Sequence, residues 1–146
     1  MKMEEITLRV PPGRIRIKEG ACPRGCNLVN QKKLMSGKPA ITVELRLRGE
    51  ISQLHLNPYY GIFEYETDVE LHAGDVVDLY CPHCKVSLTV PELCGMCRVH
   101  MFAIHLPDGG EVRACPLVGC RNHKLTIVDL DAQFAEFYDE ETKPKM

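Results

Sequence analysis

The sequence predicts an all-β fold built on a central antiparallel sheet, as a sandwich or an open barrel, with one helix at the C-terminal end. Three observations support this prediction. Apolar and polar residues alternate along much of the first 127 residues, as they do in half-buried strands. Proline and glycine clusters interrupt the alternation at short intervals. Apolar residues at helical spacing form a convincing stripe only after residue 128.

The N-terminal half is expected to contain the longer strands. Apolar side chains from Ile41 to Leu47 occupy every second position and therefore point to one face of a strand. Residues 31–39 (QKKLMSGKP) lack this alternation and are expected to form a loop. The strands expected in this half are residues 6–10, 14–18, 41–48, 54–56 and 63–71.

The C-terminal half is expected to contain shorter strands, each next to a pair of cysteines. These strands are expected at residues 76–80, 85–90, 99–106 and 111–114. The Pro-Asp-Gly-Gly sequence at 107–110 predicts a hairpin turn between the last two. Residues 129–141 (DLDAQFAEFYDEE) predict a helix with Asp129 or Asp131 as its cap. Its apolar stripe consists of Leu130, Phe134, Phe137 and Tyr138.

Composition and charge place the chain among ordinary globular proteins. Of its 146 residues, 45% are hydrophobic and 26% are charged, and the formal net charge is −2. These values do not fit wholesale disorder, a membrane protein or a generally basic nucleic-acid coat. The first ten residues carry Glu4 and Glu5 and lack the apolar run of a secretory signal. A cytoplasmic location is therefore expected.

The eight cysteines are the unusual feature of the sequence, because all of them fall in four close pairs. In a reducing compartment such clusters are expected to bind metal, and a secreted disulfide framework is the alternative. The 17 residues between Cys97 and Cys115 match the spacing of a four-cysteine zinc pattern. His123 follows Cys120 by three residues, but with eight thiols it is expected to be a surface residue. The pairs are Cys22/Cys26, Cys81/Cys84, Cys94/Cys97 and Cys115/Cys120.

These motifs resemble the zinc ribbon, a β-rich module in which two rubredoxin-type knuckles clamp one ion. The resemblance covers Cys94 to Cys120 and extends to Cys22–Cys26 joined with Cys81–Cys84. Proline after the first cysteine and glycine inside the turn are typical of such knuckles, as at Pro23, Pro82, Pro116, Gly25, Gly95 and Gly119. The chain departs from the family after the second cysteine, where the usual glycine is replaced by Asn27, Lys85, Arg98 and Arg121.

The resemblance implies two Zn²⁺ ions with all eight cysteines as ligands, and iron is possible in the same sites. A closed shell of four thiolates holds no water, so such sites are structural. The favoured pairing joins 22/26 with 81/84 and 94/97 with 115/120. A rival pairing joins 81/84 with 94/97 across nine residues and leaves 22/26 with 115/120. An interleaved cross-brace is the third possibility.

Two other functions remain open from the sequence. Cys81-Pro-His-Cys84 resembles the active-site tetrapeptide of thiol oxidases in the thioredoxin superfamily, but the residues after it predict a strand and not the required helix. Residues 1–33 hold eight Lys or Arg against three Glu, which allows nucleic-acid binding. No aromatic residue lies among them for base stacking, so this function is not favoured.

The sequence contains no serine-hydrolase elbow, Walker loop, HExxH motif or dinucleotide fingerprint. We therefore expect a non-enzymatic zinc-binding adaptor or regulatory protein whose two structural four-cysteine sites present an interaction surface to another protein. The expected division is a β domain with the first knuckles at 1–90, a zinc ribbon at 91–128, and the helix and tail at 129–146. The identity of the partner and the oligomeric state are not predicted.

Overall fold

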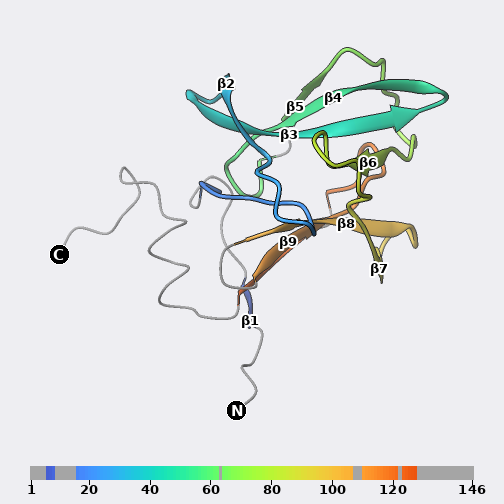
Figure 1. Ribbon diagram of the computed structural model, residues 1–146. Coiled ribbons are helices and arrows are strands. Elements are labelled where there is room, and N and C mark those ends of the chain that lie inside the picture. Colours follow the sequence, from blue (N-terminus) through green and yellow to red (C-terminus); the bar gives the residue numbers. More distant parts are fainter. Residues whose placement is uncertain (1–5, 9–15, 63, 107–109, 122, 128–146) are drawn as a thin grey trace.

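Two antiparallel sheets stacked on one another form the body of the protein (Figure 1). The computed structural model describes residues 6–8, 16–62, 64–106, 110–121 and 123–127. These residues contain ten strands and no helix, which confirms the all-β class. The helix expected at 129–141 lies outside the described residues, as do residues 107–109 of the expected hairpin turn.

The first sheet has the strand order β2-β3-β4-β5. On the side of β3 away from β4, β2 pairs with the first half of β3 and β6 pairs with residues 44–46. Its long strands follow the predicted alternation, with Ile41 opposite Leu56 and Val43 opposite Leu54 in the β3–β4 register. Its strands are β2 (Val29–Met35), β3 (Lys38–Leu47), β4 (Glu50–Leu56), β5 (Tyr65–Thr67) and β6 (Asp78–Tyr80).

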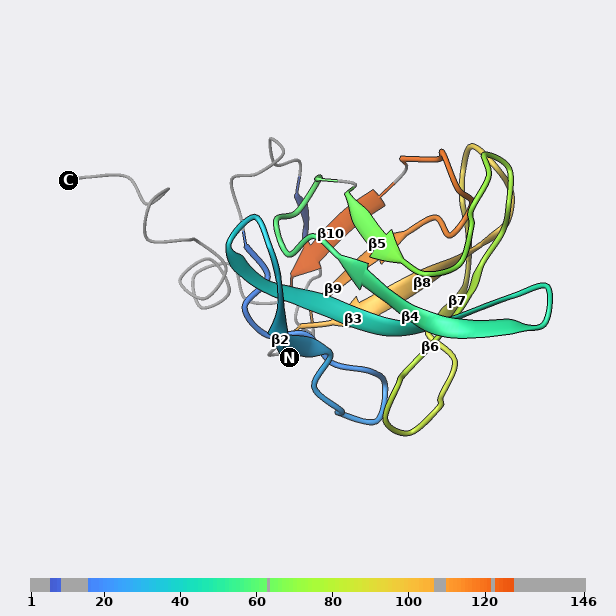
Figure 2. The ribbon, with the colours of Figure 1, turned by 90° about the horizontal axis from the view of Figure 1, so that it is seen from above.

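The second sheet has the order β1-β10-β9-β8-β7 and lies across the first (Figure 2). The β8 and β9 strands pair antiparallel from Phe102 opposite Ala114 to His105 opposite Glu111. This register agrees with the hairpin predicted between them. The strands are β1 (Ile6–Leu8), β7 (Thr89–Leu93), β8 (His100–His105), β9 (Glu111–Ala114) and β10 (His123–Ile127).

The loop predicted at residues 31–39 is wrong, because this segment contains most of β2, a turn and the start of β3. Ser36 and Gly37 form the turn with φ values of 53° and 77°, the double left-handed pattern of a two-residue hairpin. The alternation was hidden because the β2 register shifts between Asn30 and Leu34. A bulge of this kind changes which side chains face the core.

Two other predicted strands are corrected. Residues 63–71 were expected to form one long strand, but strand pairing in the described part of this segment is limited to β5, because the chain bends after Thr67 and inserts Val69 into the core. The strand expected at 14–18 is represented in the described residues by a single bridge between Arg16 and Tyr59. Ile17 and Val69 are buried in these segments without extended strand pairing.

One hydrophobic core fills the space between the sheets. Val43 and Leu45 of β3 are completely buried, and Leu79 of β6 is 2% exposed. Phe102 and Ile104 of β8 pack into the same cluster from the second sheet. The core therefore combines residues from both sides of position 90. The proposed division into domains at that position stays a prediction.

Glu44 is a buried carboxylate on β3, with its residue only 7% exposed. Its Oε1 accepts a hydrogen bond from Lys85 Nζ at 2.7 Å, and its Oε2 accepts one from Arg46 Nε at 2.9 Å. The bond from Lys85 is the main reason that the pKa of Glu44 lies below its ordinary value of 4.5. Glu44 thus links the central strand to the residue that follows Cys84.

Glu44→Gln is predicted to lower the free energy of unfolding by about 1–2 kcal/mol at pH 7, because two cations lose a buried charged acceptor. Because folding lowers the pKa of Glu44, the ionised carboxylate stabilises the folded protein. This contribution is complete above about pH 5 and is lost as the pH falls through the folded-state pKa. Urea unfolding of both proteins between pH 7 and pH 3.5 (about half-unit steps) measures this difference.

Glu66→Gln is the matched control, because Glu66 pairs with Lys33 at the surface with 53% of its side chain exposed. Its effect is expected to stay within about 0.5 kcal/mol. A Glu44→Gln effect that is no larger than this, or that does not shrink in acid, contradicts the assigned role.

Candidate metal centres

The eight cysteines gather in two clusters of four, each with its sulfur atoms within 4.8 Å of one another. Site 1 contains Cys22, Cys26, Cys81 and Cys84. Site 2 contains Cys94, Cys97, Cys115 and Cys120. This is the grouping that the sequence analysis favoured. The rival grouping of 81/84 with 94/97 and the cross-brace do not occur.

The sulfur spacing fits a tetrahedral metal ion. Cys22 Sγ lies 3.7 Å from Cys84 Sγ in site 1, and Cys94 Sγ lies 3.8 Å from Cys120 Sγ in site 2. A regular tetrahedron of sulfurs about 2.3 Å from a central zinc ion has edges of about 3.8 Å. All eight cysteines are free, and these separations are far longer than the roughly 2.05 Å of a disulfide bond. Each cluster therefore has the size needed to hold one ion.

Backbone N–H groups point at the first sulfur of each turn. In site 1, Arg24 and Cys26 donate to Cys22 Sγ at 3.3 Å each. His83 donates to Cys81 Sγ at 3.3 Å in the same site. In site 2, Cys97 donates to Cys94 Sγ at 3.4 Å. Such donors stabilise a thiolate over a thiol, which is the form that binds metal.

The two short turns close in the same way despite lacking the usual glycine. Lys85 and Arg98 follow the second cysteine and have φ values of 66° and 64°. The Lys85 N–H donates to the Cys81 carbonyl at 3.0 Å, and the Arg98 N–H donates to the Cys94 carbonyl at 2.9 Å. The left-handed conformation is therefore retained on residues that adopt it at a cost. Lys85 gains the bond to Glu44 in this position.

The two longer turns use an internal glycine instead. Gly25 has a φ of 88° and Gly119 has a φ of 99°. Each site thus combines two kinds of turn. The C-x2-C turn ends in a Lys or Arg residue with a left-handed backbone conformation, and the longer turn contains a glycine in that conformation. The two longer turns are alike in sequence, as Cys-Pro-Arg-Gly-Cys and Cys-Pro-Leu-Val-Gly-Cys, but they belong to different sites.

The sites are buried enough that four thiolates need a cation. The first cysteine of each pair is buried, at 2% exposed for Cys22 and 0% for Cys81 and Cys94. The neighbouring Cys22 raises the pKa of Cys26 to about 12, and burial raises the pKa of Cys115 to about 12. The pKa of Cys84 shifts the other way, since a backbone hydrogen bond from Val86 lowers it to about 7. A divalent ion removes this penalty by binding the deprotonated sulfurs.

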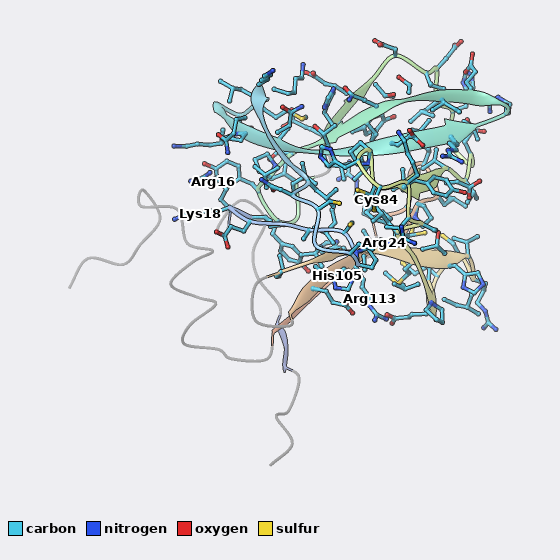
Figure 3. The ribbon with its side chains drawn as sticks, viewed as in Figure 1. Arg16, Lys18, Arg24, Cys84, His105 and Arg113 are labelled. Atoms are coloured by element: carbon cyan, nitrogen blue, oxygen red, sulfur yellow. The ribbon has the colours of Figure 1, made fainter. Side chains whose placement is uncertain are left out.

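Each site also connects the two sheets. Ala21, next to Cys22, exchanges two backbone hydrogen bonds of 2.8 Å with His105 of β8. The Cys115–Cys120 turn bonds to residues 74–77, since Val118 donates to Asp75 O at 2.7 Å and Val77 donates to Pro116 O at 3.2 Å. In the view of Figure 3, Cys84 lies at a level between the two sheets, with Arg24 below it and His105 on the second sheet. Sequence spacing gave no signal for these cross-links.

The remaining candidates lie outside the clusters. His123 belongs to neither site. Its ring packs edge-on against the Tyr60 ring, with 4.9 Å between the ring centroids. Cys81 begins a turn whose ends pair in β fashion, with Tyr80 bridged to Ser87, so the described residues contain no helix that starts at Cys81. The feature that activates the first cysteine in thioredoxin-like enzymes is therefore missing from this turn.

The chain matches no protein-family model, no characterised protein and no solved structure. Among the described residues, no helix has the length and apolar character needed to cross a membrane. The interpretation of the two sites therefore depends on their own geometry.

Arg98→Gly is predicted to stabilise the folded protein by about 0.5–1 kcal/mol, because glycine adopts the left-handed conformation without steric cost. Arg98 is exposed, so little packing is lost. Chemical denaturation of the metal-loaded protein measures the gain. Arg98→Ala is the control, since it removes the charge and keeps the Cβ atom. An equal gain in both variants would mean that the backbone conformation is not the cause.

Proposed function

We propose that this is a non-enzymatic zinc-binding protein, in which two structural zinc ions, each bound by four cysteines, hold turns that are presented to another protein. The observation that supports it most directly is the sulfur spacing of 3.7 and 3.8 Å within the two clusters. Four thiolates complete the tetrahedral shell of a zinc ion and leave no position for water or substrate. The ions therefore serve folding and shape.

Zinc is proposed over iron on the basis of relative affinity. Four thiolates in such turns also suit a single iron, so ligand geometry does not separate the two metals. For divalent ions in a common site, affinity for zinc exceeds affinity for ferrous iron. The cytoplasm is proposed as the compartment, because its reducing conditions keep the eight free thiols available.

The surface proposed for the partner lies at the tip of site 2. Met96, inside the C-x2-C turn, is 77% exposed, and Leu93 just before it is 44% exposed. Burial of such exposed, large apolar side chains against a partner favours binding. Because the turn is closed around a metal ion, its shape depends on the ion. Neither thiol oxidation nor nucleic-acid binding has a comparable observation in its favour.

Native mass spectrometry of the reduced chain is predicted to show two zinc ions per protein. Cys22→Ser combined with Cys84→Ser is expected to leave one ion, because both substitutions fall in site 1. Cys22→Ser combined with Cys94→Ser is expected to leave none, because one ligand is lost from each site. A metal-free wild-type chain, or equal metal loss in the two double variants, contradicts the assignment.

Removal of the metal by a strong chelator under reducing conditions is predicted to abolish the cooperative thermal transition. The apparent binding free energy of a structural zinc, about 10–16 kcal/mol, is comparable with the whole stability of a domain. Circular dichroism during heating measures the transition, and added zinc is expected to restore it. A chain that unfolds at the same temperature with and without metal would show that the ions are not structural.

A further inference from the structure

An apolar cavity of about 370 Å³ lies between the two sheets. Leu54 and Leu79 line it from the first sheet, and Phe102 and Ile104 line it from the second. Its volume falls within the range of about 300–1,000 Å³ that is typical of small-molecule sites. The cavity is partly open to solvent, so a small molecule can enter it and contact its apolar walls.

One wall of the cavity is the long turn of site 2. Pro116, Leu117 and Val118 all line the cavity, between the ligands Cys115 and Cys120. The same turn is fixed to residues 74–77 by backbone hydrogen bonds, including Gly74 N to Val118 O at 3.0 Å. The wall is thus held both by the metal ligands and by the segment that leads into β6.

Tyr60 supplies a polar group in this apolar surrounding. It lines the cavity and is only 5% exposed, and its hydroxyl has no hydrogen-bond partner among the described residues. Burial raises the pKa of Tyr60 to about 12, so the hydroxyl remains a donor at neutral pH. A hydroxyl that lines a cavity can donate to water there, and a ligand with an acceptor atom can take the place of that water.

The charges around the cavity disfavour an anion. Glu64 and Arg121 are both among its lining residues, so their charges oppose each other. A zinc ion with four thiolates carries a net charge of −2, and two of the site 2 thiolates line the cavity. A carboxylate next to this group would be repelled at low dielectric. The occupant is therefore expected to be neutral.

We propose that the cavity is a binding site for a small, neutral, mainly apolar molecule with a carbonyl oxygen, which accepts a hydrogen bond from the Tyr60 hydroxyl. The hydrocarbon part of the ligand lies between Leu79 and Ile104, against the site 2 turn. The preference for a neutral ligand rests on the proposed metal site. The existence of the cavity and the position of Tyr60 in its wall do not depend on a metal ion. Metal content is measured in the same samples, so failure of one proposal is distinguishable from failure of the other.

The test is a titration of the full metal-loaded chain with 2-nonanone, followed by methyl NMR. Saturable binding of one molecule is expected, with shifts at the methyl groups of Leu54, Leu79, Ile104 and Leu117. Octanoate is expected to bind at least about tenfold more weakly, because of charge repulsion. Tyr60→Phe is expected to weaken 2-nonanone binding about two- to tenfold, the value of one hydrogen bond.

Tyr65→Phe is the matched control, because Tyr65 also lines the cavity but is 44% exposed. Its affinity for 2-nonanone is expected to equal that of the wild type. Absence of saturable 2-nonanone binding by the full chain overturns the proposal. The same result is expected if the chain's own apolar stripe at 130–138 fills the cavity. Equal binding of octanoate, or an unchanged affinity in Tyr60→Phe, overturns the assigned ligand class.

Discussion

Mutual repulsion among clustered thiolates is the constraint on which this structure depends. Each site brings four sulfurs within 4.8 Å of one another, and neighbouring groups and burial raise the pKa values of several of them. Without a cation the sulfurs must stay protonated or move apart. When a cation binds the four sulfurs, the turns that carry the cysteines become fixed points of the structure. Since site 1 bonds to β8 and site 2 bonds to residues 74–77, the fixed points also set how the two sheets face each other.

The two sites share a construction but differ in their surroundings. The short turn of site 1 is supported by an ion pair between the buried Glu44 and the partly exposed Lys85, whereas Arg98 takes the same conformation at the surface. The tip of site 2 carries the exposed Met96, and its long turn forms a wall of the apolar cavity. Site 2 therefore contributes to the proposed partner surface through its short turn and to the proposed ligand cavity through its long turn.

The sequence predicted those features that depend on local pattern. Cysteine spacing favoured the two groups of four that the structure shows, and alternation predicted most of β3 and the last three residues of β4. Alternation failed at β2, where a bulge shifts the register, and at 63–71, where a bend follows Thr67. The burial of Glu44 was not predictable from local pattern, because its ion pair is with Lys85, which is 41 residues away. The cavity was not predictable either, because its walls come from both sheets and from the Cys115–Cys120 turn.

X-ray absorption spectroscopy at the metal edge of the reduced, freshly isolated chain tests the central claim most directly. It measures the identity of the metal, the type of ligand and the metal–ligand distance in one experiment. The account predicts zinc surrounded by four sulfurs at about 2.3 Å, with no nitrogen or oxygen ligand. A folded chain without metal, or a shell that contains nitrogen or oxygen, would contradict it.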